Sequence, residues 1–116
     1  MQMLMLDDLD DAALDQLPFG VVCLDGGERM KVVRMNRTES EATGIQRWRA
    51  IGREFFREIA PGPANRDLAE AVRAFADGDG PPALSHVFPR WRGNADATQI
   101  EMVRGRDAAV YLCIRR

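Results

Sequence analysis

The feature that most constrains the fold is a pair of short apolar runs, joined by a glycine turn, that leads directly into a helix signal. The first run, residues 19–24, ends at Asp25-Gly26-Gly27, where glycine supplies the positive φ that a tight hairpin turn needs. The second run, residues 30–35, is followed by Asn36, a strong N-cap. Gly44 is a typical C-cap, so the chain predicts a β-hairpin that continues into a short helix.

The rest of the chain predicts helices first and strands afterwards. An acid-rich amphipathic stretch, residues 7–17, indicates a helix with Asp7 or Asp8 as its N-cap. A second helix is expected to begin near Asn65 or Asp67 and to stop at the glycine and proline cluster that follows. Beyond that cluster, apolar and polar residues alternate as in half-buried strands. The predicted strands are 19–25, 29–35, 83–91, 96–104 and 108–115, with hairpin turns at 92–95 and 104–107.

Composition and charge restrict the function classes. The chain has 116 residues, enough for one domain, and its net charge of −2 with interspersed signs argues against direct nucleic-acid binding. No apolar run approaches a membrane span and the N-terminus lacks a basic leader, so a cytoplasmic protein without a membrane partner is expected. Cys23 and Cys113 fall in predicted strands and are interpreted as buried thiols. No catalytic triad, metal cluster or phosphate-binding glycine loop is found, which indicates that the protein is not an enzyme.

An ordered set of short motifs resembles the photoactive yellow protein branch of the PAS family, over roughly residues 14–116. The motifs are Leu17-Pro18-Phe19-Gly20, Leu24-Asp25-Gly26, Asn36 with Glu39 and Thr43-Gly44, Ile51-Gly52-Arg53-Glu54-Phe55-Phe56, and Ile59-Ala60-Pro61. The resemblance implies an α+β PAS fold: a five-stranded antiparallel sheet of order 2-1-5-4-3, with helices packed on one face around a ligand cavity. The element order predicted from the residues agrees with that fold.

The chemistry of the chromophore is where the chain departs from the yellow proteins. Their p-coumaroyl thioester is carried by a cysteine directly after the Ala-Pro step, and the matching residue here is Gly62. The tyrosine that donates to their phenolate corresponds to Met35, which has no hydrogen to donate. Glu39 matches their carboxyl partner, with Thr43 nearby. The candidate cavity-lining residues are Met35, Glu39, Thr43, Gly62 and His86. The protein is therefore expected to be non-photoactive and to need no cofactor.

Two of these candidates have other interpretations. Glu39 follows Asn36 at the spacing of a capping box, in which the glutamate bonds back to the first helical amides. His86 shares a predicted strand face with apolar residues, so it is either a core residue bonded to backbone or an axial ligand of haem. Haem-binding PAS domains usually take their histidine from the helix that here spans 66–76, which has none. Met35 is a conceivable second haem ligand only if His86 is the first.

The expected division is a helical N-terminal cap or dimerisation segment at residues 1–17 and a PAS domain at 18–116. Met1 to Leu6 and the leucines Leu9, Leu14 and Leu17 have no evident place in a PAS core, so they are expected to contact the partner in a homodimer. The alternative is that this segment folds over its own sheet and leaves a monomer.

Three functional hypotheses remain open at this point. The first is a regulatory sensor module that binds a small molecule and acts on a fused effector domain or a downstream signalling protein. The second is an interaction or dimerisation module without a ligand, and the third is a haem-based gas sensor. The fold alone does not choose among them.

Overall fold

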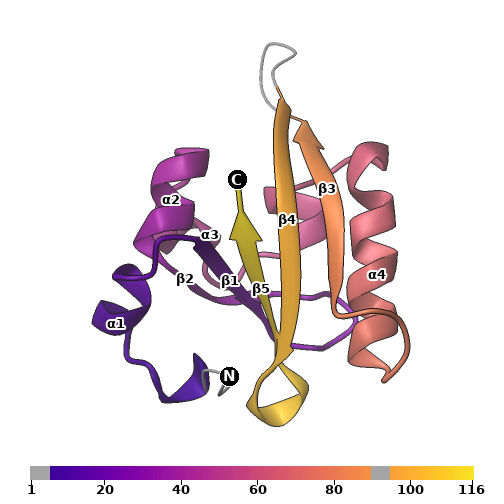
Figure 1. The fold of residues 1–116 in the computed structure, drawn as a ribbon, viewed down its shortest axis with the longest axis horizontal. Coiled ribbons are helices and arrows are strands. Elements are labelled where there is room, and N and C mark those ends of the chain that lie inside the picture. The colour runs from indigo at the N-terminus through magenta and orange to yellow at the C-terminus, as the bar shows by residue number, and fades with distance from the viewer. Residues whose placement is uncertain (1–5, 90–94) are drawn as a thin grey trace.

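The structure, a computed structural model, describes residues 6–89 and 95–116. Its centre is a five-stranded antiparallel sheet with the strand order β2-β1-β5-β4-β3 (Figure 1). The strands are β1 (Gly20–Leu24), β2 (Val32–Met35), β3 (Ala83–Pro89), β4 (Ala95–Arg104) and β5 (Val110–Arg115). The predicted fold class and strand order are therefore confirmed.

The first hairpin closes as its sequence indicates. Oδ1 of Asp25 accepts hydrogen bonds from the backbone N–H groups of Gly27 and Lys31, at 2.9 and 3.2 Å. This arrangement of an aspartate over its own turn is a common way to fix a tight bend. β2 begins at Val32 rather than at 29, because Met30 has a φ of +47° and leaves the extended conformation.

The later strands agree with the prediction where they are described. A 3₁₀ turn, Arg106–Ala108, joins β4 to β5, and its positive φ values at Asp107 and Ala108 explain why β5 begins at Val110 and not at 108. The predicted end of the third strand, 90–91, and most of the predicted turn at 92–95 lie outside the described residues.

One face of the sheet carries the larger helices. These are α2 (Arg37–Thr43), α3 (Arg47–Ala50) and α4 (Arg66–Ala76), with a π-helical turn (Phe55–Ile59) and a 3₁₀ turn (Pro63–Asn65) between them. In Figure 1, α2 and α3 lie toward one end of the sheet and α4 toward the other. The inward-facing strand residues, such as Val22, Ile100 and Leu112, are buried against this helical layer and form the main core.

The opposite face is covered by the N-terminal segment of the same chain. A 3₁₀ turn (Leu6–Asp8) and α1 (Asp11–Asp15) place Leu6 and Leu14 against Cys23, Tyr111 and Cys113 in a second apolar cluster. Both cysteines are buried and free, as the sequence interpretation has it. In the part of the chain that the structure describes, no helix is long and apolar enough to cross a bilayer.

Two expectations for the N-terminal segment are wrong. The helix over 7–17 is broken into two short pieces, and the N-cap of α1 is Asp10, whose side chain accepts from the N–H of Ala13 at 2.8 Å. Asp7 does not cap because its carboxylate accepts instead from the Tyr111 hydroxyl and from the backbone N–H of Arg106, at 2.9 and 2.7 Å.

The segment was also expected to offer its leucines to a partner. Leu14 is 1% exposed against the chain's own sheet, and Leu9 and Leu17 are half-buried beside it. The arrangement within residues 6–17 is therefore the alternative one, in which the segment folds over its own sheet. Residues 1–5, which were part of the same expectation, lie outside the described residues.

Candidate functional site

A cleft of about 410 Å³ opens on the helical side of the sheet, between α2 and the turns that precede α4. Its apolar walls include Met35, Ile45, Phe55, Ile59, Ala60 and Phe88. Its polar lining comes from Glu39, Thr43, Asn65, Asp96 and Arg116. A volume within the range of roughly 300–1,000 Å³ and an apolar wall with a few converging polar groups are typical of a small-molecule site.

The charged residues of the cleft form one connected group. Arg116 donates Nη1 to Oε1 of Glu39 at 2.7 Å and Nη2 to Oε2 at 3.1 Å, a bidentate pair. Its Nε donates to Oδ2 of Asp96 at 2.9 Å. The Glu39 side chain is only 5% exposed, so this pair is largely shielded from water, where charge-assisted bidentate bonds are strongest. Burial opposes the charge of Arg116, but its hydrogen bonds and the charges of Glu39 and Asp96 outweigh this and raise the pKa of the guanidinium.

Gly20, at the start of β1, makes room for the Glu39 carboxylate. A Cβ atom at this position would stand 2.0 Å from Oε1 of Glu39 and 3.0 Å from its Cδ. A residue larger than glycine would therefore force the Glu39 carboxylate to move away from its pair with Arg116. The placement of the carboxylate in the cleft therefore depends on this glycine.

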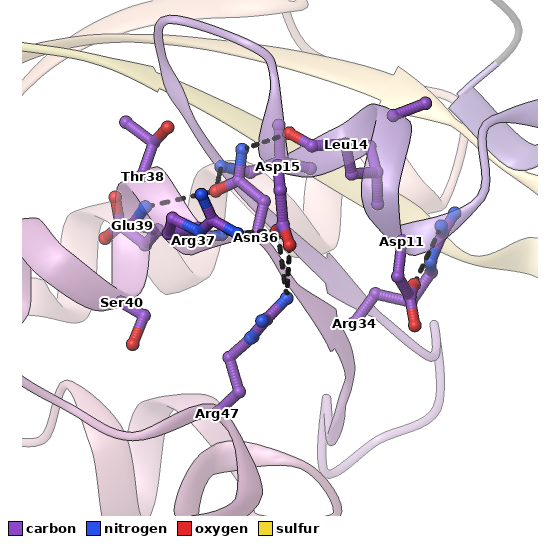
Figure 2. A network of polar contacts seen from close by, with 12 residues as sticks. Asp11, Leu14, Asp15, Arg34, Asn36, Arg37, Thr38, Glu39, Ser40 and Arg47 are labelled. Atoms are coloured by element: carbon purple, nitrogen blue, oxygen red, sulfur yellow. Dashed lines mark hydrogen bonds and ion pairs between the residues drawn. The ribbon is translucent and has the colours of Figure 1, made fainter.

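Asn36 holds the start of α2 in place from both sides (Figure 2). Its Oδ1 accepts from the backbone N–H groups of Val21 and Glu39 at 2.9 and 3.1 Å, and its Nδ2 donates to the carbonyls of Leu14 and Phe19 at 2.9 and 3.0 Å. One fully buried amide thus joins α1, β1 and α2. The predicted N-cap is confirmed.

Glu39 does not complete a capping box, because its side chain does not bond back to the start of α2. The backbone N–H of Asn36 donates to the carbonyl of Val21 at 3.0 Å, so it is already satisfied by the sheet. The Glu39 carboxylate is consequently turned away from the helix start and pairs with Arg116 instead.

A second link ties the N-terminal segment to the helical layer. The Asp15 carboxylate accepts from the backbone N–H of Arg37 at 2.7 Å and from Nη1 of Arg47 at 2.9 and 3.0 Å (Figure 2). On the outer face, Arg34 donates to the carbonyls of Leu6 and Leu9. The N-terminal segment, the sheet and α2 are therefore held as one unit.

Of the candidate residues, Met35 and Thr43 line the cleft together with Glu39. Met35 is 4% exposed and contributes an apolar wall. Thr43 uses its hydroxyl locally: Oγ1 donates to the carbonyl of Glu39 at 2.9 Å and accepts from the N–H of Ile45 at 3.2 Å. Its hydroxyl therefore closes the end of α2.

Gly62 and His86, in contrast, do not line this cleft. Gly62 lies in the exposed turn before Pro63, with a φ of +102°. His86 is buried and its Nε2 lies 2.8 Å from Oδ1 of Asn65. Because Nδ2 of Asn65 donates to the carbonyl of Ala60, its Oδ1 is the acceptor and His86 the donor. The hydrogen bond from His86 therefore helps to hold Asn65, which lines the cleft, in place.

Comparison with known families identifies the fold. The sequence matches the family described as the PAS fold over residues 14–112, which is most of the chain. The chain belongs to the PAS fold family. This PAS domain is 34% identical over 82 residues to the photoactive yellow protein of Rhodothalassium salexigens; the matched part is 70% of this chain and 64% of that protein, less than two thirds of its length.

Solved structures support the same conclusion. The chain is similar to the photoactive yellow protein domain of the sensor histidine kinase Ppr from Rhodospirillum centenum, with a TM-score of 0.78, 29% identity and 97% of each chain covered. It also shares its fold with the PAS domain of an HTR-like protein from Haloarcula marismortui, with a TM-score of 0.63 and 16% identity, over 91% of this chain and 86% of that one.

The residues that complete the cleft of this PAS domain were missed in the sequence. Arg116 and Asp96 belong to β-rich regions with mixed charges, and no local pattern marks them as neighbours of Glu39, which is 77 positions from Arg116. The sequence pattern marks Asn65 only as a possible helix start. Because long-range charge pairs have no sequence period, only the fold brings these groups together.

Haem does not fit this arrangement. The one histidine of the chain, His86, has Nε2 2.8 Å from Oδ1 of Asn65, and its side chain is not part of the cleft wall. Residues 6–89 and 95–116 also contain no group of three or more histidine, cysteine, aspartate or glutamate side chains placed to hold a metal ion.

Proposed function

We propose that this PAS domain is a non-photoactive sensor or regulatory module for signal transduction, whose input is a small molecule bound in the cleft. The observation that carries the proposal is the cleft itself: an apolar chamber with one connected group of charges at Glu39, Asp96 and Arg116. A wall of this kind selects for ligand shape, and the charges select for ligand chemistry.

Similar proteins support the sensor role. One similar domain belongs to a sensor histidine kinase, and another similar chain, from Erythrobacter litoralis, is a blue-light activated histidine kinase of which this fold covers 35%. In such proteins the PAS fold is a part of a larger signalling chain. A fused effector domain or a separate signalling protein is accordingly the proposed recipient of the signal.

Charge argues against an anionic chromophore in the cleft. The Glu39 carboxylate lies in the cleft, and the Arg116 guanidinium is already engaged with Glu39 and Asp96. A phenolate placed beside Glu39 would meet a like charge, and Met35 offers it no hydrogen bond. The thiols of Cys23 and Cys113 lie in the other apolar cluster, on the opposite face of the sheet, where burial raises the pKa of each to about 11.

Native mass spectrometry of the freshly purified protein tests the small-molecule role. We expect a co-purifying mass that is released on unfolding, and we expect its occupancy to fall in Glu39→Gln, which alters the cleft. Occupancy that is unchanged in this variant would place the ligand elsewhere and contradict the proposal. A fully ligand-free spectrum would favour the second candidate.

That second candidate is a protein-interaction module, and one exposed surface favours it. Trp48 is 76% exposed, and Val33 and Ile51 are each 44% exposed, around the short helix α3 and the edge strand β2. Tryptophan is enriched at interaction hot spots. Light scattering on the wild-type chain and on Trp48→Ala tests whether this surface supports a homodimer: a dimer that Trp48→Ala leaves intact would exclude it.

A further inference from the structure

Arg116 occupies a place in the cleft that a free cation could take, and this defines the class of ligand. The guanidinium makes a bidentate pair with Glu39, at 2.7 and 3.1 Å, and reaches Asp96 through Nε at 2.9 Å. Arg116 is the residue directly after β5, and in Figure 1 the C-terminus accordingly lies between α2 and β4. The two carboxylates come from α2 and β4, so the cation position exists independently of the strand that supplies Arg116.

We propose that the cleft binds a small organic cation with a planar amidinium or guanidinium head and an apolar body, and that this cation displaces Arg116 from Glu39. The inference rests on the proposed small-molecule function and names its ligand class. A planar head with paired N–H donors reproduces the bidentate bonds to Glu39, which neither a neutral nor an anionic group of the same shape can do. The apolar body has a wall ready for it in Met35, Ile45 and Phe88.

Electrostatics favours this exchange over the entry of an anion. Displacement of Arg116 removes the guanidinium charge from beside the Glu39 carboxylate, which is largely shielded from water. A ligand cation restores a positive charge beside Glu39, whereas a carboxylate or phosphate would place a second negative charge next to that buried carboxylate.

Arg116 therefore acts as a tethered competitor of the ligand. A side chain attached to the end of β5 has an effective concentration in the millimolar range or above, so a free cation must outcompete it through its apolar contacts. Binding would free the residue that follows β5 from both α2 and β4. The exchange thus couples ligand binding to the position of the chain after the last strand.

Three probes of one shape test the ligand class: benzamidine (cationic), benzamide (neutral) and benzoate (anionic). Each is titrated into isotopically labelled protein while the side-chain Nε–H signal of Arg116 and the backbone amide signals of Glu39 and Asn65 are followed by NMR. We expect benzamidine alone to bind and to shift the Arg116 signal toward that of a solvated guanidinium. Benzamide or benzoate binding as tightly as benzamidine would overturn the cation assignment while leaving a small-molecule site in place.

Variants distinguish displacement of Arg116 by the ligand from a general attraction of cations to the protein. Arg116→Gln removes the competitor, so the affinity for benzamidine should rise by about tenfold. The matched control is Arg115→Gln, which removes the same charge from a residue that contacts Phe19 and Glu101 and does not line the cleft. An equal gain in the control would show a general charge effect and overturn the displacement. Glu39→Gln should lose binding, and thermal unfolding confirms that each variant is folded.

A null titration is also decisive. If benzamidine fails to bind both the wild type and folded Arg116→Gln, the cation inference is wrong. The small-molecule role is then judged separately by native mass spectrometry of the wild type, which does not depend on the ligand's charge.

Discussion

Gly20 and Glu39 depend on each other at the scale of single residues. Replacing Gly20 by alanine places a Cβ against the Glu39 carboxylate, which Arg116 holds in place, so we expect Gly20→Ala to destabilise the fold by about 1–3 kcal/mol, as overpacked sites do. Urea unfolding measures the change. In a Glu39→Ala background the obstacle is gone, and the cost of Gly20→Ala should fall by more than half.

The control for this prediction is Gly27→Ala. An added Cβ at Gly27 meets only the Asp25 side chain at 3.4 Å or more, which is ordinary contact, so a change within about 0.5 kcal/mol is expected. If Gly20→Ala costs the same with and without the Glu39 side chain, the proposed dependence does not exist.

His86 gives the protein an acid-sensitive contribution to stability. Burial lowers the pKa of His86, with the charge of Asp67 opposing this, so the unfolded chain takes up a proton at a higher pH than the folded one. The stabilisation is therefore present above about pH 6.5, the ordinary value, and is lost as the pH falls through the folded pKa. We expect His86→Gln to lose less unfolding free energy than the wild type between pH 7.5 and 5.5 in urea titrations. A larger loss in the variant would reverse the assigned direction.

The N-terminal segment is an element whose role can be measured through one leucine. Leu14 is 1% exposed and packs over Cys23, so Leu14→Ala should cost about 2–4 kcal/mol and should speed alkylation of Cys23 by iodoacetamide. In the wild type the raised pKa, about 11, and burial should keep this thiol unreactive at pH 8. Trp48→Ala removes a larger but exposed side chain and should change neither quantity appreciably. Rapid alkylation of wild-type Cys23 would show that the segment does not cover the sheet.

The elements also show how far the sequence could be interpreted. The hairpin at Asp25, the cap at Asn36 and the helix end at Gly44 were predictable because each depends on neighbours a few residues away. The break between the 3₁₀ turn and α1 was not predictable, because the Asp7 carboxylate accepts a hydrogen bond from Tyr111, which is 104 positions later in the chain. Glu39 was found as a candidate, but its partner Arg116 was not, since no period in the sequence marks a pair formed across the sheet.

At the scale of the whole molecule, two apolar layers on one antiparallel sheet serve different purposes. The outer layer, covered by the N-terminal segment, contains both thiols, and the carbonyl of Leu14 in that segment accepts a hydrogen bond from Asn36. The inner layer contains the cleft and its charges. This separation keeps both cysteines away from the cavity, and with Gly62 in an exposed turn, the described part of the chain offers no thiol to a ligand bound there.

The most direct test of the central claim is therefore reconstitution with activated p-coumaric acid, followed by visible absorbance and intact mass. Gly62→Cys serves as the control that the reagent acylates a thiol at this position. We predict a mass increment on Gly62→Cys, and for the wild type neither a mass increment nor a visible absorption band. A wild-type chain that gains both, through Cys23 or Cys113, would contradict the proposal that this PAS domain is a sensor that does not use light.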